Sequence, residues 1–342
     1  MVIHKDMNND KSPMHVWARK IATQQNFSNP KLIYQGGHYA KEDVRNVIYE
    51  GLYQGKLAVL KVYDDPRPSD EPISQKRYLE DNTSSILTAP EVYAYEMVAP
   101  NKGWFIMEKL PENGSFFTTP LSENDRKEFL NIFVEYRKNF PRKATRETLL
   151  VENLPAHEFC AFRISRWLEF VAKQELKSIF KGEQPLLDRN VFVPLYAKAM
   201  EVLRLEFSKR EMIWCHGHFK PQEIYKVSDD KYYVTDFAHT RLYPEGYEFG
   251  FIIWADYLMS ADWSESYESW KQGVLEWFDA LRPVADELGV ERYDDLIRAS
   301  MIERVLGTIL ADVHASDVSN KNKIHRIEYL QMLLRELINH EQ

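Results

Sequence analysis

The sequence predicts an α+β fold of two lobes, in which a small antiparallel β-sheet with one helix precedes a larger and mainly helical lobe. β-branched and aromatic residues recur at strand-like spacing in the first third of the chain, and helical periodicity dominates the remainder. Pro111 and Gly114 interrupt the pattern where the two parts meet. A chain of 342 residues is also long enough to bury two cores.

The expected first lobe covers residues 31–110 and follows a polar extension, residues 1–30, which contains one short helix candidate at 14–24. A helix is expected over 71–81, because Ser69 or Asp70 can cap its N-terminus and Pro72 falls in its first turn. The strand segments expected in this lobe are 31–34, 46–50, 57–63, 91–98 and 103–108.

The expected second lobe covers residues 111–342 and is built mainly from helices. Its first helix, 122–139, opens with Ser122 and places acidic residues in the first turn, where they stabilise a helix N-terminus. A β-hairpin at 223–235 interrupts the helical pattern. Further helices are predicted at 156–181, 190–208, 264–288, 291–316 and 320–340.

Charge and composition limit the classes of partner. The formal net charge of −8 argues against a nucleic-acid surface, because phosphate binding needs a basic face. Cys160 and Cys215 form no disulfide or metal-binding pattern, which favours a reducing compartment. The N-terminus lacks a signal-peptide pattern, and the longest apolar stretch, 249–259, is too short to span a bilayer. We therefore expect a cytoplasmic protein that binds neither nucleic acid nor membrane.

Residues 212–250 hold the strongest chemical signal in the chain. An apolar run ends in His216, Gly217 and His218, a hairpin follows, and a second apolar run ends in Asp236. A carboxylate at a strand end that faces a cleft suits a hard cation such as Mg²⁺. A solvated loop aspartate explains Asp236 equally well when that residue is considered alone.

The order of residues in this segment resembles the signature of the aminoglycoside phosphotransferase and choline kinase superfamily, whose members are related to the protein kinases. That signature is His-Gly-Asp, four spacers and Asn, then Asp-Phe-Glu, then Tyr-Asp-Leu-Ala. The resemblance implies a protein-kinase-like fold, ATP and Mg²⁺ as cofactors, and an unidentified small hydroxylated molecule as the acceptor. The positions that match in register are His216, Gly217, Pro221, Ile224, Asp236, Phe237 and Tyr247.

The resemblance also implies nucleotide-binding roles in the first lobe. Lys61, on the third strand, would bind the ATP phosphates, and Gly36 with Gly37 would form a glycine turn over them. An outward-pointing edge lysine and an ordinary loop turn are the plain alternatives for these residues. The hinge, whose backbone would hydrogen-bond adenine, comprises Glu108, Lys109 and Leu110.

Four residues of the signature segment receive roles from the same resemblance. Asp236 would be catalytic through Mg²⁺, and Glu223 would be the second metal ligand. His216 would be structural and bridge the loop backbones. Glu248 would be structural as well, as an acceptor for backbone N–H groups of the catalytic loop.

The chain departs from the signature at positions that matter for chemistry. His218 stands where the superfamily has its catalytic aspartate, Glu223 where it has an asparagine, and Ala238 where Asp-Phe-Glu ends. The helix residue that pairs with Lys61 is also undefined. Its candidates are Gln75, which the spacing favours, and Glu71 and Glu80, about one turn away on either side.

Two interpretations of these departures stay open. In the first, Glu223 supplies a hard oxygen to Mg²⁺, and His218 acts as the base, since histidine ordinarily titrates near pH 6.5. In the second, the chain is a pseudokinase that binds nucleotide for a binding or regulatory role. Loss of a positioned acid–base group costs about 10²–10⁴-fold in rate, and a protonated His218 would attract the γ-phosphate instead of accepting a proton.

A metal-dependent hydrolase is a third interpretation. His216 and His218, with Asp236 and His239, could ligate one metal ion, because two histidines at alternate positions of a strand end can share a metal. This interpretation leaves the hinge-like segment before Pro111 unexplained.

The residues after the motif bear on the acceptor. Several aromatic residues follow the motif at helical spacing, and such residues are expected in the core. The alternative is that they line an acceptor pocket. They are Trp254, Tyr257, Trp263, Tyr267 and Trp270. Acidic residues nearby would favour a cationic acceptor if they face the pocket, and a solvated acidic face is the alternative. These acids are Asp256, Asp262, Glu265 and Glu268.

Overall fold

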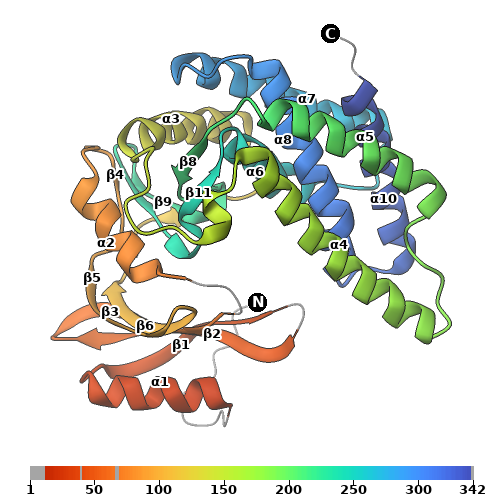
Figure 1. Cartoon of the computed structure of the whole chain (residues 1–342). Coiled ribbons are helices and arrows are strands. Elements are labelled where there is room, and N and C mark those ends of the chain that lie inside the picture. The colour runs from red at the N-terminus through yellow and green to blue at the C-terminus, as the bar shows by residue number, and fades with distance from the viewer. Residues whose placement is uncertain (1–11, 39–40, 66–68, 340–342) are drawn as a thin grey trace. The chain divides into compact units, whose positions relative to one another are not determined.

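A computed structural model describes residues 12–38, 41–65 and 69–339 of the chain (Figure 1). Contacts divide the chain into two compact units. The first unit, Met1–Phe116 with Glu223–Thr240, holds most of the strands, and the second, Phe117–Gln222 with Arg241–Gln342, holds most of the helices. The expected α+β fold of two lobes is confirmed, while the lobe bounds 31–110 and 111–342 stay a prediction.

A five-stranded antiparallel sheet forms the core of the first unit, in the order β1-β2-β3-β6-β5. The helix α1 (Pro13–Gln24) covers one face of it, and its Ala18 and Ile21 belong to the same apolar cluster as Tyr49 and Leu60 of the sheet (Figure 1). The strands are β1 (Ser28–His38), β2 (Lys41–Tyr53), β3 (Lys56–Asp64), β5 (Val92–Ala99) and β6 (Lys102–Glu108).

A smaller sheet in the same unit joins segments that are far apart in sequence. Its order is β4-β10-β9-β7, with β10 parallel to β4 and antiparallel to β9. The helix α2 (Glu71–Asp81) packs on the 3₁₀ turn after β10, where the Tyr78 and Phe237 rings lie 5.1 Å apart. This packing fixes the segment that begins at Asp236. The strands are β4 (Leu87–Thr88), β7 (Ser115–Phe116), β9 (Ile224–Ser228) and β10 (Lys231–Val234).

The second unit consists of helices and one two-stranded antiparallel ribbon. β8 (Met212–Cys215) pairs with β11 (Arg241–Pro244), so the two ends of the signature segment lie side by side. Two π-helical turns, Trp254–Leu258 and Thr308–Asp312, extend α6 and α8. The helices are α3 (Glu123–Asn139), α4 (Ala156–Phe180), α5 (Arg189–Phe207), α6 (Tyr247–Ile253), α7 (Tyr267–Glu287), α8 (Tyr293–Gly307), α9 (Val313–Ala315) and α10 (Asn320–Asn339).

Burial separates the aromatic residues that follow the signature. Trp263, Tyr267 and Trp270 are buried, and the two tryptophan rings lie 5.0 Å apart, so the expected core role is confirmed for these three. Trp254 and Tyr257 are only half-buried. Among the described residues, no helix combines the length and the apolar character that crossing a bilayer requires.

Candidate functional site

Lys61 lies in the middle of β3, between Ile48 of β2 and Phe105 of β6, and its side chain is 11% exposed. Its Nζ lies 2.7 Å from each carboxylate oxygen of Glu71, the first residue of α2. A buried ammonium needs such a partner, because desolvation of an unpaired charge is costly. The edge-lysine alternative does not fit this position, which is central and buried.

The spacing argument for the partner of Lys61 is wrong in its first choice. Gln75 is buried, but its Nε2 donates to the carbonyl of Pro90 at 2.6 Å. Because α2 begins at residue 71, its first turn and not its second presents a carboxylate to Lys61. Glu71, which the sequence offered only as a neighbouring candidate, is the partner.

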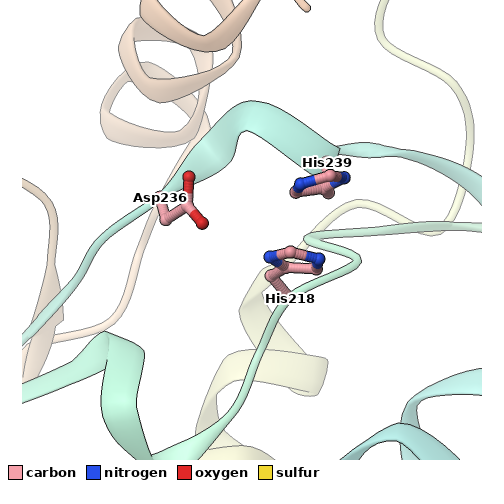
Figure 2. A group of neighbouring side chains, drawn as sticks. All are labelled: His218, Asp236 and His239. Atoms are coloured by element: carbon pink, nitrogen blue, oxygen red, sulfur yellow. The ribbon is translucent and has the colours of Figure 1, made fainter. Parts of the chain in front are cut away.

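Asp236 lies two residues after the end of β10, in the left-handed region of the backbone, with φ of 59°. A residue other than glycine is strained by about 1–2 kcal/mol in that conformation, and such strain is often found at functional sites. Its Oδ1 lies 3.7 Å from Lys61 Nζ, and its side chain is 28% exposed. Figure 2 shows Asp236 and His239 at the two ends of the 3₁₀ turn.

Glu223 is tied to the residue that precedes Asp236. The backbone carbonyl of Glu223 accepts hydrogen bonds from the Thr235 N–H at 3.0 Å and from its Oγ1 at 3.1 Å. Thr235 Oγ1 is also 3.1 Å from Glu223 Oε2. Thr235 therefore fixes Glu223 relative to Asp236, a role that the sequence does not indicate because a threonine just after a strand carries no signal.

Three carboxylates thus surround one ammonium in the first unit. Burial lowers the pKa of Lys61, but Glu71, Asp236 and Glu223 act in the opposite direction and leave it raised. Burial, with the charge of Asp236, raises the pKa of Glu71 to about 7 against the attraction of Lys61. The excess of negative charge and the oxygen donors of Asp236 and Glu223 fit a hard divalent cation such as Mg²⁺.

The hinge-like segment begins with Glu108, the last residue of β6, and is half-buried. The N–H of Glu108 donates to the Glu91 carbonyl at 2.8 Å, so this donor is already used. The Glu108 carboxylate accepts from the N–H of Glu91 at 3.2 Å and from the hydroxyl of Tyr233 at 3.4 Å. Lys109 Nζ pairs with Glu50 at 3.0 Å. Leu110 continues the segment.

Gly36 and Gly37 lie in β1 and not in a turn. Gly36 pairs with Asn46 and Gly37 with Val44, with a register shift between them. A Cβ at Gly36 would stand 2.3 Å from the side-chain oxygen of Asn46, so a larger residue there would require that side chain to shift. The residues between β1 and β2, at 39–40, lie outside the described residues.

In the second unit, a hydrogen-bond network holds the loop after β8. The N–H of His216 donates to the Tyr136 hydroxyl at 2.8 Å, and that hydroxyl donates to Glu248 Oε1 at 2.8 Å. Arg137 Nη1 donates to the Trp214 carbonyl at 3.2 Å and lies 3.3 Å from Glu248 Oε2. Glu248 therefore reaches the loop through Tyr136 and Arg137, two residues that the sequence analysis missed.

His216 is fully buried, and its Nδ1 accepts the N–H of His218 at 3.3 Å. This arrangement favours a structural role over metal ligation, since metal binding through Nδ1 would break the bond to the loop. His218 is half-buried, and its ring stacks on Phe251 with centroids 5.1 Å apart and planes 17° from parallel. The loop that carries His218 also appears in Figure 2.

The acidic residues after the motif have other partners. Asp256 is 1% exposed and accepts from the N–H of Leu121 at 2.9 Å and from Trp277 Nε1 at 3.2 Å, and burial raises its pKa. Asp262, Glu265 and Glu268 are exposed. Their arrangement favours the solvated acidic face over an acid-lined acceptor pocket.

No family model and no curated protein sequence matches the chain. Solved structures do match it. An aminoglycoside phosphotransferase in a ternary complex with ADP and hygromycin B has a TM-score of 0.58 and 13% identity, over 95% of this chain and 99% of that one. A microcompartment-associated aminopropanol kinase has a TM-score of 0.57 and 14% identity, over 94% and 96%.

A choline kinase from Streptococcus pneumoniae also matches, with a TM-score of 0.55 and 12% identity over 94% of this chain and 98% of that one. At these identities the likeness concerns the fold. The expected protein-kinase-like fold is thereby confirmed for this chain.

Proposed function

We propose that the protein binds Mg·ATP and transfers the γ-phosphoryl group to the hydroxyl of a small molecule. The observation that carries this proposal is the set of Lys61, Glu71, Asp236 and Glu223 in the first unit. Lys61, held by Glu71, would bind the phosphates, and Asp236 with Glu223 would hold Mg²⁺.

The charge balance of this site predicts that nucleotide binding requires the metal. Three carboxylates outnumber the single ammonium of Lys61, so the polyphosphate of free ATP would be repelled. A divalent cation bound by Asp236 and Glu223 would reverse that repulsion and neutralise charge on the phosphates. Glu223 adds a negative charge where the superfamily signature has a neutral asparagine, which makes the metal requirement stronger.

His218 is the residue that we assign to the acceptor. The acceptor oxygen forms a bond to the γ-phosphorus, the bond between that phosphorus and the β–γ bridging oxygen breaks, and ADP leaves with the bond's electron pair. The proton of the acceptor hydroxyl passes to the neutral imidazole of His218. Stacking on Phe251 orients the ring for this step.

The structures of an aminopropanol kinase and a choline kinase with the same fold suggest amino alcohols as the first acceptors to test. The acidic residues after the motif do not support a cation-binding pocket, because Asp256 already accepts two hydrogen bonds and the other three acids are exposed. Neutral polyols therefore belong in the same panel.

A pseudokinase is the second candidate, and the replacement of the catalytic aspartate by His218 favours it. Its nucleotide site would serve a binding or regulatory role. A metal-dependent hydrolase is the third, and the buried His216 argues against it.

Calorimetric titration of ATP with and without Mg²⁺, beside ADP release over the acceptor panel, separates these candidates. Phosphoryl transfer predicts Mg-dependent binding and turnover, both lost in Lys61→Met and kept in Lys56→Met, a lysine that is exposed on the same strand. Binding without turnover, with turnover restored by His218→Asp and Glu223→Asn together, would establish the pseudokinase. Absence of nucleotide binding would refute the proposal, and stoichiometric zinc that is lost in His218→Ala would favour the hydrolase.

A further inference from the structure

A pocket in the second unit is lined by none of the residues assigned to phosphoryl transfer. Its volume is 250 Å³, and its walls come from α3, β8, the start of α6 and the end of α7. This volume lies just below the range for drug-sized ligands, which begins at roughly 300 Å³. The pocket is therefore limited to a small molecule, such as one with a single ring and a short chain. Five of its lining side chains are apolar: Phe133, Ile213, Phe249, Leu288 and Val290.

The two acidic residues at the rim of the pocket are already paired with basic ones. Glu287 accepts from Lys138 Nζ at 2.6 Å, and Glu245 accepts from Arg142 Nη2 at 3.0 Å. Arg210 places a second cation 3.5 Å from Glu245. A cationic ligand would therefore have to displace an existing ion pair before it could bind an acid here.

Arg137, which also lines the pocket, has a donor that the protein does not use. Its side chain is 5% exposed, and its Nη1 donates to the Trp214 carbonyl and the Tyr136 hydroxyl. Its Nη2 is buried and has no hydrogen-bond partner among the described residues. Such orphaned buried donors are rare, and a guanidinium forms its strongest pairs with planar anions such as carboxylates.

We propose that this pocket binds a small carboxylate-bearing molecule with an apolar, single-ring body. The carboxylate would accept from Arg137 Nη2, while the ring packs on the apolar residues. The proposal does not depend on phosphoryl transfer, because none of these groups belongs to the nucleotide or acceptor chemistry.

Occupancy of the pocket would act on the loop that carries His218. Arg137 and Glu248 both line the pocket, and they hold this loop through Trp214 and Tyr136. A ligand carboxylate on Arg137 competes with Glu248 for the same guanidinium. Backbone amide exchange at residues 214–218 should therefore change when the ligand binds.

The test uses the full chain and three probes with one body, 3-phenylpropionate, 3-phenylpropanamide and 3-phenylpropylamine. Ligand-observed NMR titration measures affinity, and amide exchange locates the site. We expect roughly millimolar binding of the carboxylate, at least tenfold weaker binding of the amide, and no binding of the amine. Exchange should slow at residues 133–142, 245–249 and 287–290, and should change at 214–218.

Two variants connect the probe to the pocket. Arg137→Lys keeps the charge and removes the Nη2 donor, so carboxylate binding should fall at least tenfold. If that variant does not fold, Val290→Trp fills the pocket from its rim and should abolish binding, whereas Val193→Trp on the exposed face of α5 should not. Equal binding of all three probes, retained binding in Val290→Trp, or an exchange response confined to other residues would overturn the proposal.

Discussion

The buried pair of Lys61 and Glu71 leads to a quantitative prediction about stability. Lys61→Met removes the ammonium and leaves the Glu71 carboxylate, 4% exposed, buried without its ion-pair partner. Removal of one partner of a buried ion pair costs about 3–5 kcal/mol of unfolding free energy. Apolar replacement of a whole buried ion pair is often neutral for stability. The double variant Lys61→Met with Glu71→Leu also removes the unpaired carboxylate, so its loss of unfolding free energy should be about 2 kcal/mol smaller than that of Lys61→Met alone.

The cost of Lys61→Met should depend on pH through Glu71. The pKa of this carboxyl is already raised to about 7 in the intact protein, from 4.5 in the unfolded chain. For an acid with a raised pKa, the folded state holds more protons than the unfolded state between these two values, so stability rises as the pH falls through that window. A difference of 2.5 pKa units corresponds to about 3 kcal/mol, and loss of Lys61 raises the folded pKa further.

Guanidinium denaturation followed by tryptophan fluorescence, at pH 5 and at pH 8, measures these free energies. We expect Lys61→Met to be destabilised by about 3 kcal/mol or more at pH 8 and by clearly less at pH 5, when Glu71 is protonated. Lys56→Met should match the parent protein at both pH values, because Lys56 is exposed. A cost that is the same at both pH values, or additive effects of the two substitutions, would refute the assignment of Lys61 and Glu71 as a coupled pair.

Three further predictions concern the carboxylates. Glu223→Gln should weaken Mg·ATP binding but reduce its dependence on Mg²⁺ concentration, which calorimetry at several Mg²⁺ concentrations measures; an unchanged dependence would remove Glu223 from the metal site. Asp236→Gly should abolish Mg-dependent binding while it raises the unfolding free energy by about 1 kcal/mol, because glycine tolerates φ of 59°; lower stability would contradict the strain argument. Glu248→Gln leaves the buried Arg137 without its carboxylate and should cost about 3 kcal/mol and most of the turnover, with Mg·ATP affinity retained; a parallel loss of affinity would show that Glu248 acts on more than the loop.

The sequence predicts the long elements of this fold because each of them repeats its apolar pattern several times. The helices over 123–139, 156–180 and 320–339 differ from the expected bounds by a residue or two. The short strands β4, β7 and β11 have no such repeat and are not expected. β4 matters for the site, since its parallel pairing with β10 is a contact between residues 87–88 and 232–233 that no local pattern encodes.

The residues of the candidate site also differ in whether a sequence pattern marks them. Lys61, Asp236 and Glu223 can be proposed from the sequence because a strand end or a signature position marks each of them. Glu71 is not selected, because the choice among three residues of one helix depends on where α2 begins against β3. Tyr136 and Arg137 act on the loop from a helix more than seventy residues earlier in the chain, and only the folded structure brings them there.

Two of the replaced signature positions, Glu223 and His218, raise separate chemical questions. Glu223 lies with Lys61 and Asp236 in the first unit, so it concerns the cation and the nucleotide. His218 lies in the second unit, stacked on Phe251, so it concerns the acceptor's proton. A substitution at Glu223 should change Mg·ATP affinity even in a chain that transfers nothing, whereas one at His218 should change turnover. Nucleotide binding and phosphoryl transfer can thus be tested separately, and a pseudokinase would differ from an active kinase in turnover and not in Mg·ATP binding.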